Sequence, residues 1–71
     1  MQIELLSEVA LLRDIPDRGL TRGQVGTVVE RLSPETVEVE FSDNNGRTYA
    51  SSDVRTLDLV RLHHEPQEQV A

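Results

Sequence analysis

The stretch from Thr36 to Phe41 alternates strictly between apolar and acidic residues after its first position. Because successive side chains of a β-strand point to opposite faces, Val37, Val39 and Phe41 share one face and the glutamates share the other. Two-residue alternation dominates from Val9 onward, and no stretch repeats apolar residues at helical spacing. The chain is therefore expected to fold as β-strands that each bury one face.

Turn-forming residues divide this pattern into separate strands. Pro34 pre-sets the backbone of a tight turn, and Asn45-Gly46 is a strong hairpin signal because both residues tolerate positive φ. A single helical turn is predicted over Thr56 to Leu59. The predicted strands are Glu8 to Leu12, Val25 to Leu32, Thr36 to Phe41, Arg47 to Ser51 or slightly beyond, and Val60 to Leu62.

The order of these elements predicts an all-β fold, a small five-stranded SH3-like barrel with one short helical turn before the last strand. A long loop over Arg13 to Gln24 is expected to pack on the barrel through Ile15 and Leu20. Closing the sheet removes the exposed edges that a small Val-rich sheet would otherwise present. We expect one domain over residues 1–64 and a disordered tail over residues 65–71.

Composition narrows the classes of function. The 71 residues allow a single small domain, and the absence of cysteine excludes a disulfide framework and a thiolate nucleophile and fits the cytoplasm. No apolar run is long enough for a membrane span, so no membrane insertion is expected. The chain has no lysine, hence no phosphate-binding Gly-x-x-x-x-Gly-Lys motif, and none of its serines lies in a nucleophile elbow.

These absences predict that the chain is not an enzyme and has no cofactor, no metal and no small-molecule substrate. His63 and His64 are adjacent, and adjacent strand residues point to opposite sides, so they do not converge on one ion. Glu38 and Glu40 are poor catalytic acids because an open strand face supplies neither burial nor a pocket.

Glycine spacing links the chain to a known pattern. The segment from Gly19 to Val29 is similar to the glycine pattern of KOW-type SH3-like domains, in which a loop enters the second strand. Gly19 and Gly23 accept positive φ, and Gly26 permits close approach of neighbouring backbone.

Taken with Val9 to Pro16 and Val37 to Phe41, that segment resembles a bacterial family, the domain of unknown function numbered 4926, whose small members are common in cyanobacteria. The similarity covers roughly Leu5 to Leu62 and implies the barrel fold, but it implies no catalytic residue. Apolar residues are expected where this chain has Ser51-Ser52, so the fourth strand is predicted to be frayed or paired differently.

The KOW-like pattern raises RNA or ribonucleoprotein binding as an alternative function. Arg18 and Arg22, together with Arg13 and Arg47, would form a local basic spot, although Asp14 and Asp17 lie among them. The net charge of -6 disfavours phosphate contacts, and no aromatic platform accompanies the arginines. Nucleic acid is therefore not the expected partner.

The leading hypothesis is a protein–protein interaction module whose partner the sequence does not identify. Glu38 and Glu40 share a strand face, Glu30 of the preceding strand is expected beside them, and such a patch steers basic partners. The alternative interpretation is a solvated face that prevents aggregation. An antitoxin or immunity protein covering a basic toxin is one version, and an accessory subunit of a larger complex, including photosynthetic ones, is another. The loop from Arg13 to Gln24 is the alternative binding surface.

Overall fold

Every predicted strand is present, with end positions that differ from the prediction by a few residues. The computed structural model describes residues 3–63. Within that range the only helical elements are two short 3₁₀ turns, of which the second matches the predicted helical turn. The elements are β1 (Glu8–Leu11), η1 (Pro16–Arg18), β2 (Val25–Ser33), β3 (Thr36–Ser42), β4 (Thr48–Arg55), η2 (Thr56–Asp58) and β5 (Leu59–Arg61).

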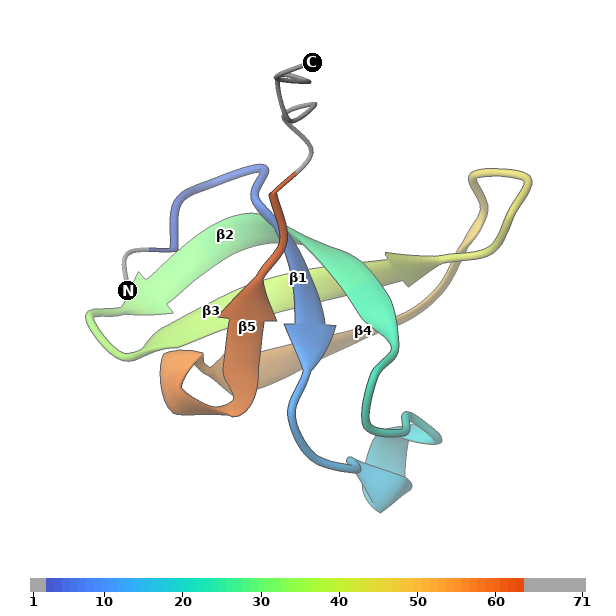
Figure 1. Ribbon diagram of the computed structural model, residues 1–71, viewed down its shortest axis with the longest axis horizontal. Helices are drawn as coiled ribbons and strands as arrows, with labels where there is room; N and C mark the ends of the chain where they lie inside the picture. Colours follow the sequence, from blue (N-terminus) through green and yellow to red (C-terminus); the bar gives the residue numbers. More distant parts are fainter. Residues whose placement is uncertain (1–2, 64–71) are drawn as a thin grey trace, which may run out of the picture.

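The five strands form one antiparallel sheet in the order β4-β3-β2-β1-β5 (Figure 1). The all-β, five-stranded prediction is confirmed, but the predicted closure into a barrel is wrong. After η2 the chain continues into β5, which pairs with β1 through Leu59 and Leu11. Within residues 3–63 no pairing joins β4 to β5. The sheet thus keeps two edges, β4 and β5. The SH3-like assignment stays a prediction.

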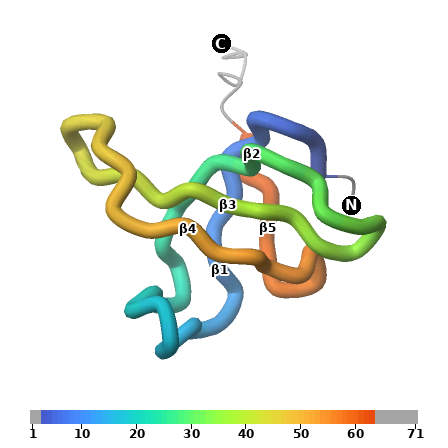
Figure 2. Tube along the Cα trace, turned by 180° about the vertical axis from the view of Figure 1, so that it is seen from behind, coloured from blue at the N-terminus to red at the C-terminus, as the bar shows by residue number. Residues whose placement is uncertain are grey.

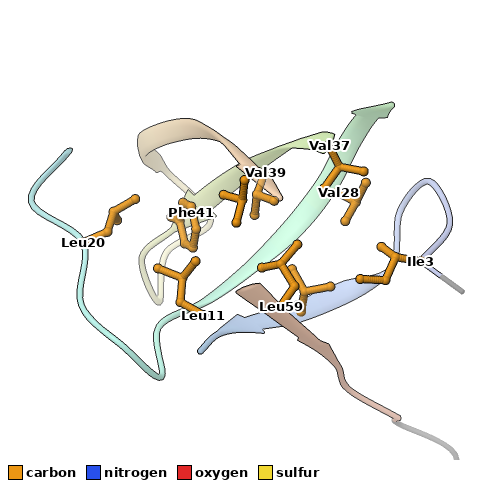
Figure 3. Close-up of a cluster of buried hydrophobic side chains, with 10 residues drawn as sticks. Ile3, Leu11, Leu20, Val28, Val37, Val39, Phe41 and Leu59 are labelled. Atoms are coloured by element: carbon orange, nitrogen blue, oxygen red, sulfur yellow. The ribbon is translucent and has the colours of Figure 1, made fainter. Parts of the chain in front are cut away.

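The buried core lies on the face of β3 that carries Val37, Val39 and Phe41, each with an exposed fraction of 0%. Figure 3 shows Phe41 near Leu11 and Leu20, two side chains from distant parts of the chain. The predicted core face of β3 is confirmed. Other buried apolar side chains are Ile3, Val9, Val28, Val54 and Leu59.

Gly26 lies where β2 crosses the core, and no side chain fits there. A Cβ at this position would be 2.6 Å from Val39 Cγ1, 2.7 Å from the Glu40 carbonyl oxygen and 2.9 Å from Phe41 Cδ2. The predicted close approach of backbone at Gly26 is confirmed.

The loop between β1 and β2 is ordered by the two anchors predicted for it. Leu20 is 1% exposed, and Ile15 and Leu20 form an isolated antiparallel bridge. Between them the chain makes η1 and ends it at Gly19, whose φ of 68° is the left-handed conformation that glycine favours. Asp14 Oδ1 accepts a hydrogen bond of 2.8 Å from the Arg22 N–H and holds the far side of the loop.

β4 runs unbroken through the position where fraying was predicted. Ser51 and Ser52 pair with Glu40 and Val39 of β3. Ser52 tolerates the core side because its hydroxyl donates a hydrogen bond of 3.0 Å to the Asp53 carbonyl. The expectation of a frayed or displaced strand at the two serines is therefore wrong.

The chain ahead of β1 also packs on the sheet, which the sequence patterns did not predict. Ile3 is buried, and its carbonyl accepts a hydrogen bond from the Arg31 guanidinium. The same guanidinium donates to the carbonyls of Ser33 and Pro34, so Arg31 connects this segment to the turn between β2 and β3. The predicted disordered tail at 65–71 lies outside the described residues.

Candidate interaction surface

Three carboxylates from three strands line up on the face of the sheet opposite the core. Glu30 pairs with Glu38, and Glu38 pairs with Asp53, which gives one row across β2, β3 and β4. We call Glu30, Glu38 and Asp53 the acidic row. Glu40 lies one alternate position along β3, between Thr27 and Ser51.

A β-bulge brings Glu30 into this row. Val28 pairs with Val39, whereas Glu30 pairs with Glu38, so β2 has one extra residue, Val29, at this point. Strict alternation from buried Val28 would have turned Glu30 toward the core. The extra residue moves the carboxylate to the solvent face, as bulges do when they re-aim a side chain. The predicted proximity of Glu30 and Glu38 is confirmed, but the bulge that produces it was not predicted.

Backbone pairing places Glu38 and Asp53 close together. The Thr56 N–H donates to the Glu35 carbonyl at 2.8 Å, so hydrogen-bonded pairs alternate from that point along β3 and β4. Glu38 and Asp53 are consequently a non-hydrogen-bonded pair, in which Cα atoms approach to about 4.5 Å. Like charges placed directly opposite each other destabilise a sheet by about 0.2–1 kcal/mol. The acidic row thus opposes folding.

Within residues 3–63 none of the three carboxylates of the acidic row forms an ion pair. The ion pair within residues 3–63 joins Arg13 to Asp58 at 3.6 Å, and both residues line the same groove as Asp53. Glu40 Oε1 accepts a long hydrogen bond of 3.5 Å from the Thr48 hydroxyl. The row is therefore a local concentration of negative charge in a chain whose formal net charge is already -6.

Arg18 and Arg22 lie on the loop between β1 and β2, whose course Figure 2 shows, and not on a strand of the acidic row. Both side chains are exposed. The structure therefore brings the three predicted glutamates onto one face of the sheet, whereas the two predicted arginines belong to the loop.

Tyr49 contacts the end of this loop. Gln24 Nε2 donates a hydrogen bond of 2.8 Å to the Tyr49 hydroxyl, and the ring side chain is 51% exposed. Gln24 and Tyr49 are far apart in sequence, so no local sequence pattern predicts their contact.

A shallow groove of about 170 Å³ runs along β4 and contains residues that the sequence did not single out. Asp53, Val54 and Arg55 all line it, although alternate side chains of a strand point to opposite faces. The groove therefore follows the backbone edge of β4. Its remaining wall is formed by Arg13, Ile15 and Asp58.

Within residues 3–63 no three His, Cys, Asp or Glu side chains are grouped so that they could hold a metal ion. His63 is exposed, and its neighbour His64 lies outside the described residues. No helix in the same range has the length and apolar character needed to cross a membrane.

Comparison with known proteins places the chain in a protein family. The family model described as "Domain of unknown function (DUF4926)" matches residues 5–61. No curated protein and no solved structure matches the chain. The family description names no activity, so a function can be inferred only from the geometry of the surface.

Proposed function

Since the chain belongs to the family of the domain of unknown function DUF4926, which its model matches over residues 5–61, we propose that it is a non-catalytic module that binds a basic protein through its acidic row. The carrying observation is that Glu30, Glu38 and Asp53 lie side by side and form no ion pair within residues 3–63. Repulsion within the row destabilises the fold, and features that cost stability are expected mainly at functional sites.

The charge arrangement supports steering of a partner. A surface of one sign raises the rate of encounter with a partner of the opposite sign, and the effect decreases with salt. Glu40 extends the negative surface along β3. A basic toxin held by an antitoxin-type module is one partner of the required charge. The absence of cysteine is compatible with the reducing cytoplasm, where we place this function.

The test compares two variants of equal net charge. The row variant carries Glu30→Gln, Glu38→Gln and Asp53→Asn. The control variant carries Glu4→Gln, Asp17→Asn and Glu35→Gln, which change three exposed carboxylates outside the row. An arginine-rich peptide is titrated into each isotope-labelled protein at low and at high salt, and amide shifts are recorded by NMR.

We expect the wild type and the control variant to bind the peptide with shifts centred on β2, β3 and β4. The row variant should lose this binding and should be as stable as the wild type or up to about 1 kcal/mol more stable, because repulsion has been removed. Equal loss of binding in both variants would show that net charge alone attracts the peptide, and the proposed site would be wrong.

A further inference from the structure

β4 has an edge that no other strand of the described chain covers, because it stands first in the sheet order. Hydrogen-bonded pairs with β3 alternate from Glu35 and Thr56, so Asp53 and Arg55 belong to non-hydrogen-bonded pairs. In such pairs the backbone N–H and C=O groups point away from the neighbouring strand. Asp53 and Arg55 therefore present their backbone groups to the free edge, as does Ser51.

The second half of this edge lacks the devices that usually prevent strand addition. It contains no proline or lysine, and the register shift between β3 and β4 lies at the other end, between Phe41 and Ser42. A groove lies beside this part of the edge, between Asp53, Val54 and Arg55 on one side and Arg13, Ile15 and Asp58 on the other. The Ser52 hydroxyl occupies one lone pair of the Asp53 carbonyl, and the second lone pair stays available.

Opposite charges alternate along this part of the edge. Asp53 and Arg55 are both exposed and both point to the face that carries the acidic row. The recorded ion pair within residues 3–63 involves neither of them. The segment Asp53-Val54-Arg55 is therefore complementary in charge to a second, antiparallel copy of itself.

We propose that two copies of this chain associate through antiparallel pairing of their β4 edges, with the two-fold axis at Val54. Outward backbone groups must face each other, which leaves registers centred on Ser52, Asp53 or Val54. The register centred on Asp53 would set that carboxylate against itself. Only the register centred on Val54 places each Asp53 directly opposite the Arg55 of the second copy.

This pairing gives Asp53, the member of the acidic row at the sheet edge, a partner of opposite charge directly across the new strand pair. The Arg55 side chain of the second copy continues the row beyond Asp53, at the usual strand spacing of about 4.8 Å. Leu57, which is 74% exposed just after β4, comes to lie near Ser51 of the second copy. The two sheets join into one, and both core faces stay on the same side. The inference does not depend on the proposed binding of a basic protein.

The first measurement is the mass of the wild-type protein by sedimentation over a concentration range up to about 1 mM, the weak end of specific association. A mass that rises toward the dimer is expected. A monomer over the whole range overturns the proposal.

Charge reversal then tests the register. In Asp53→Arg and in Arg55→Asp, both symmetry-related pairs change from attraction to repulsion. The dimer dissociation constant of each variant alone should therefore rise at least about tenfold. An equimolar mixture of the two variants should form the heterodimer, and the double variant Asp53→Arg/Arg55→Asp should recover the homodimer. Circular dichroism verifies that each variant is folded.

The control variant Glu35→Gln/Asp17→Asn should dimerise like the wild type. Dimers that persist in both single variants, or a mixture that stays monomeric, would exclude pairing at this register. If a reversed variant does not fold, Asp53→Asn and Arg55→Gln replace it, and each must then weaken the dimer.

Discussion

Replacement of Gly26 by alanine tests how closely β2 and β3 approach inside the core. The added Cβ would be 2.7 Å from the Glu40 carbonyl oxygen, whereas a carbon and a carbonyl oxygen normally approach no closer than about 3.3 Å. The oxygen belongs to the β3 backbone beside Thr27, so relief requires the strands to separate by about 0.6 Å. The side-chain contacts with Val39 and Phe41 are also too short, but those atoms can rotate.

Overpacking of this kind costs about 1–3 kcal/mol, and a clash with backbone belongs at the upper end. Alanine loses less backbone entropy than glycine on folding, which offsets about 0.5–1 kcal/mol. We therefore expect Gly26→Ala to lower the free energy of unfolding by about 2 kcal/mol and the Tm by about 8–16 °C. Urea unfolding and thermal melts followed by circular dichroism measure both quantities.

A second substitution identifies which contact is responsible. Val39→Ala removes the Cγ1 atom that lies 2.6 Å from the added Cβ but leaves the Glu40 oxygen in place. The cost of Gly26→Ala in the Val39→Ala background should therefore decrease only in part. Full rescue would assign the clash to the side chain. A Gly26→Ala protein as stable as the wild type would refute the close approach itself.

Two further predictions concern the core and the loop. Phe41→Ala should lower the free energy of unfolding by about 3–5 kcal/mol, because Phe41 is completely buried, and a melt within 2 °C of the wild type would contradict the role of this ring. Mixed-sequence RNA titrated at low salt should show no binding that depends on Arg18 and Arg22, since the net charge of -6 opposes phosphate contacts. Binding that is lost in Arg18→Gln/Arg22→Gln would instead establish the loop, with Tyr49 beside it, as an RNA site.

Local patterns predicted the features of this fold that depend on neighbouring residues. The alternation from Val37 to Phe41 identified the core face because strand geometry has a strict period of two. The turn at Gly46 was recognisable because its φ of 80° favours glycine. Both features are decided within a few residues of the chain.

Features that depend on distant residues were not recognisable in the same way. Fraying was predicted at Ser51-Ser52 because the sequence does not show that the Ser52 hydroxyl donates a hydrogen bond to the Asp53 carbonyl. Asp53 was missed as the third member of the acidic row because its place opposite Glu38 follows from the β3–β4 register. Closure of the sheet was expected from element order alone, which does not determine where β5 pairs.

The position of β1 between β2 and β5 has a consequence for how the protein folds. Val9 pairs with Gly26 on one side and with Arg61 on the other, so β1 joins the two ends of the described chain. The β2–β3–β4 meander requires only short loops, whereas the β1–β5 pair must enclose nearly the whole chain. Loop closure over that distance is slow, and folding rates decrease as contacts become less local. The meander is thus expected to form before the rate-limiting step, with β5 joining last, so the acidic row is assembled before the domain is complete.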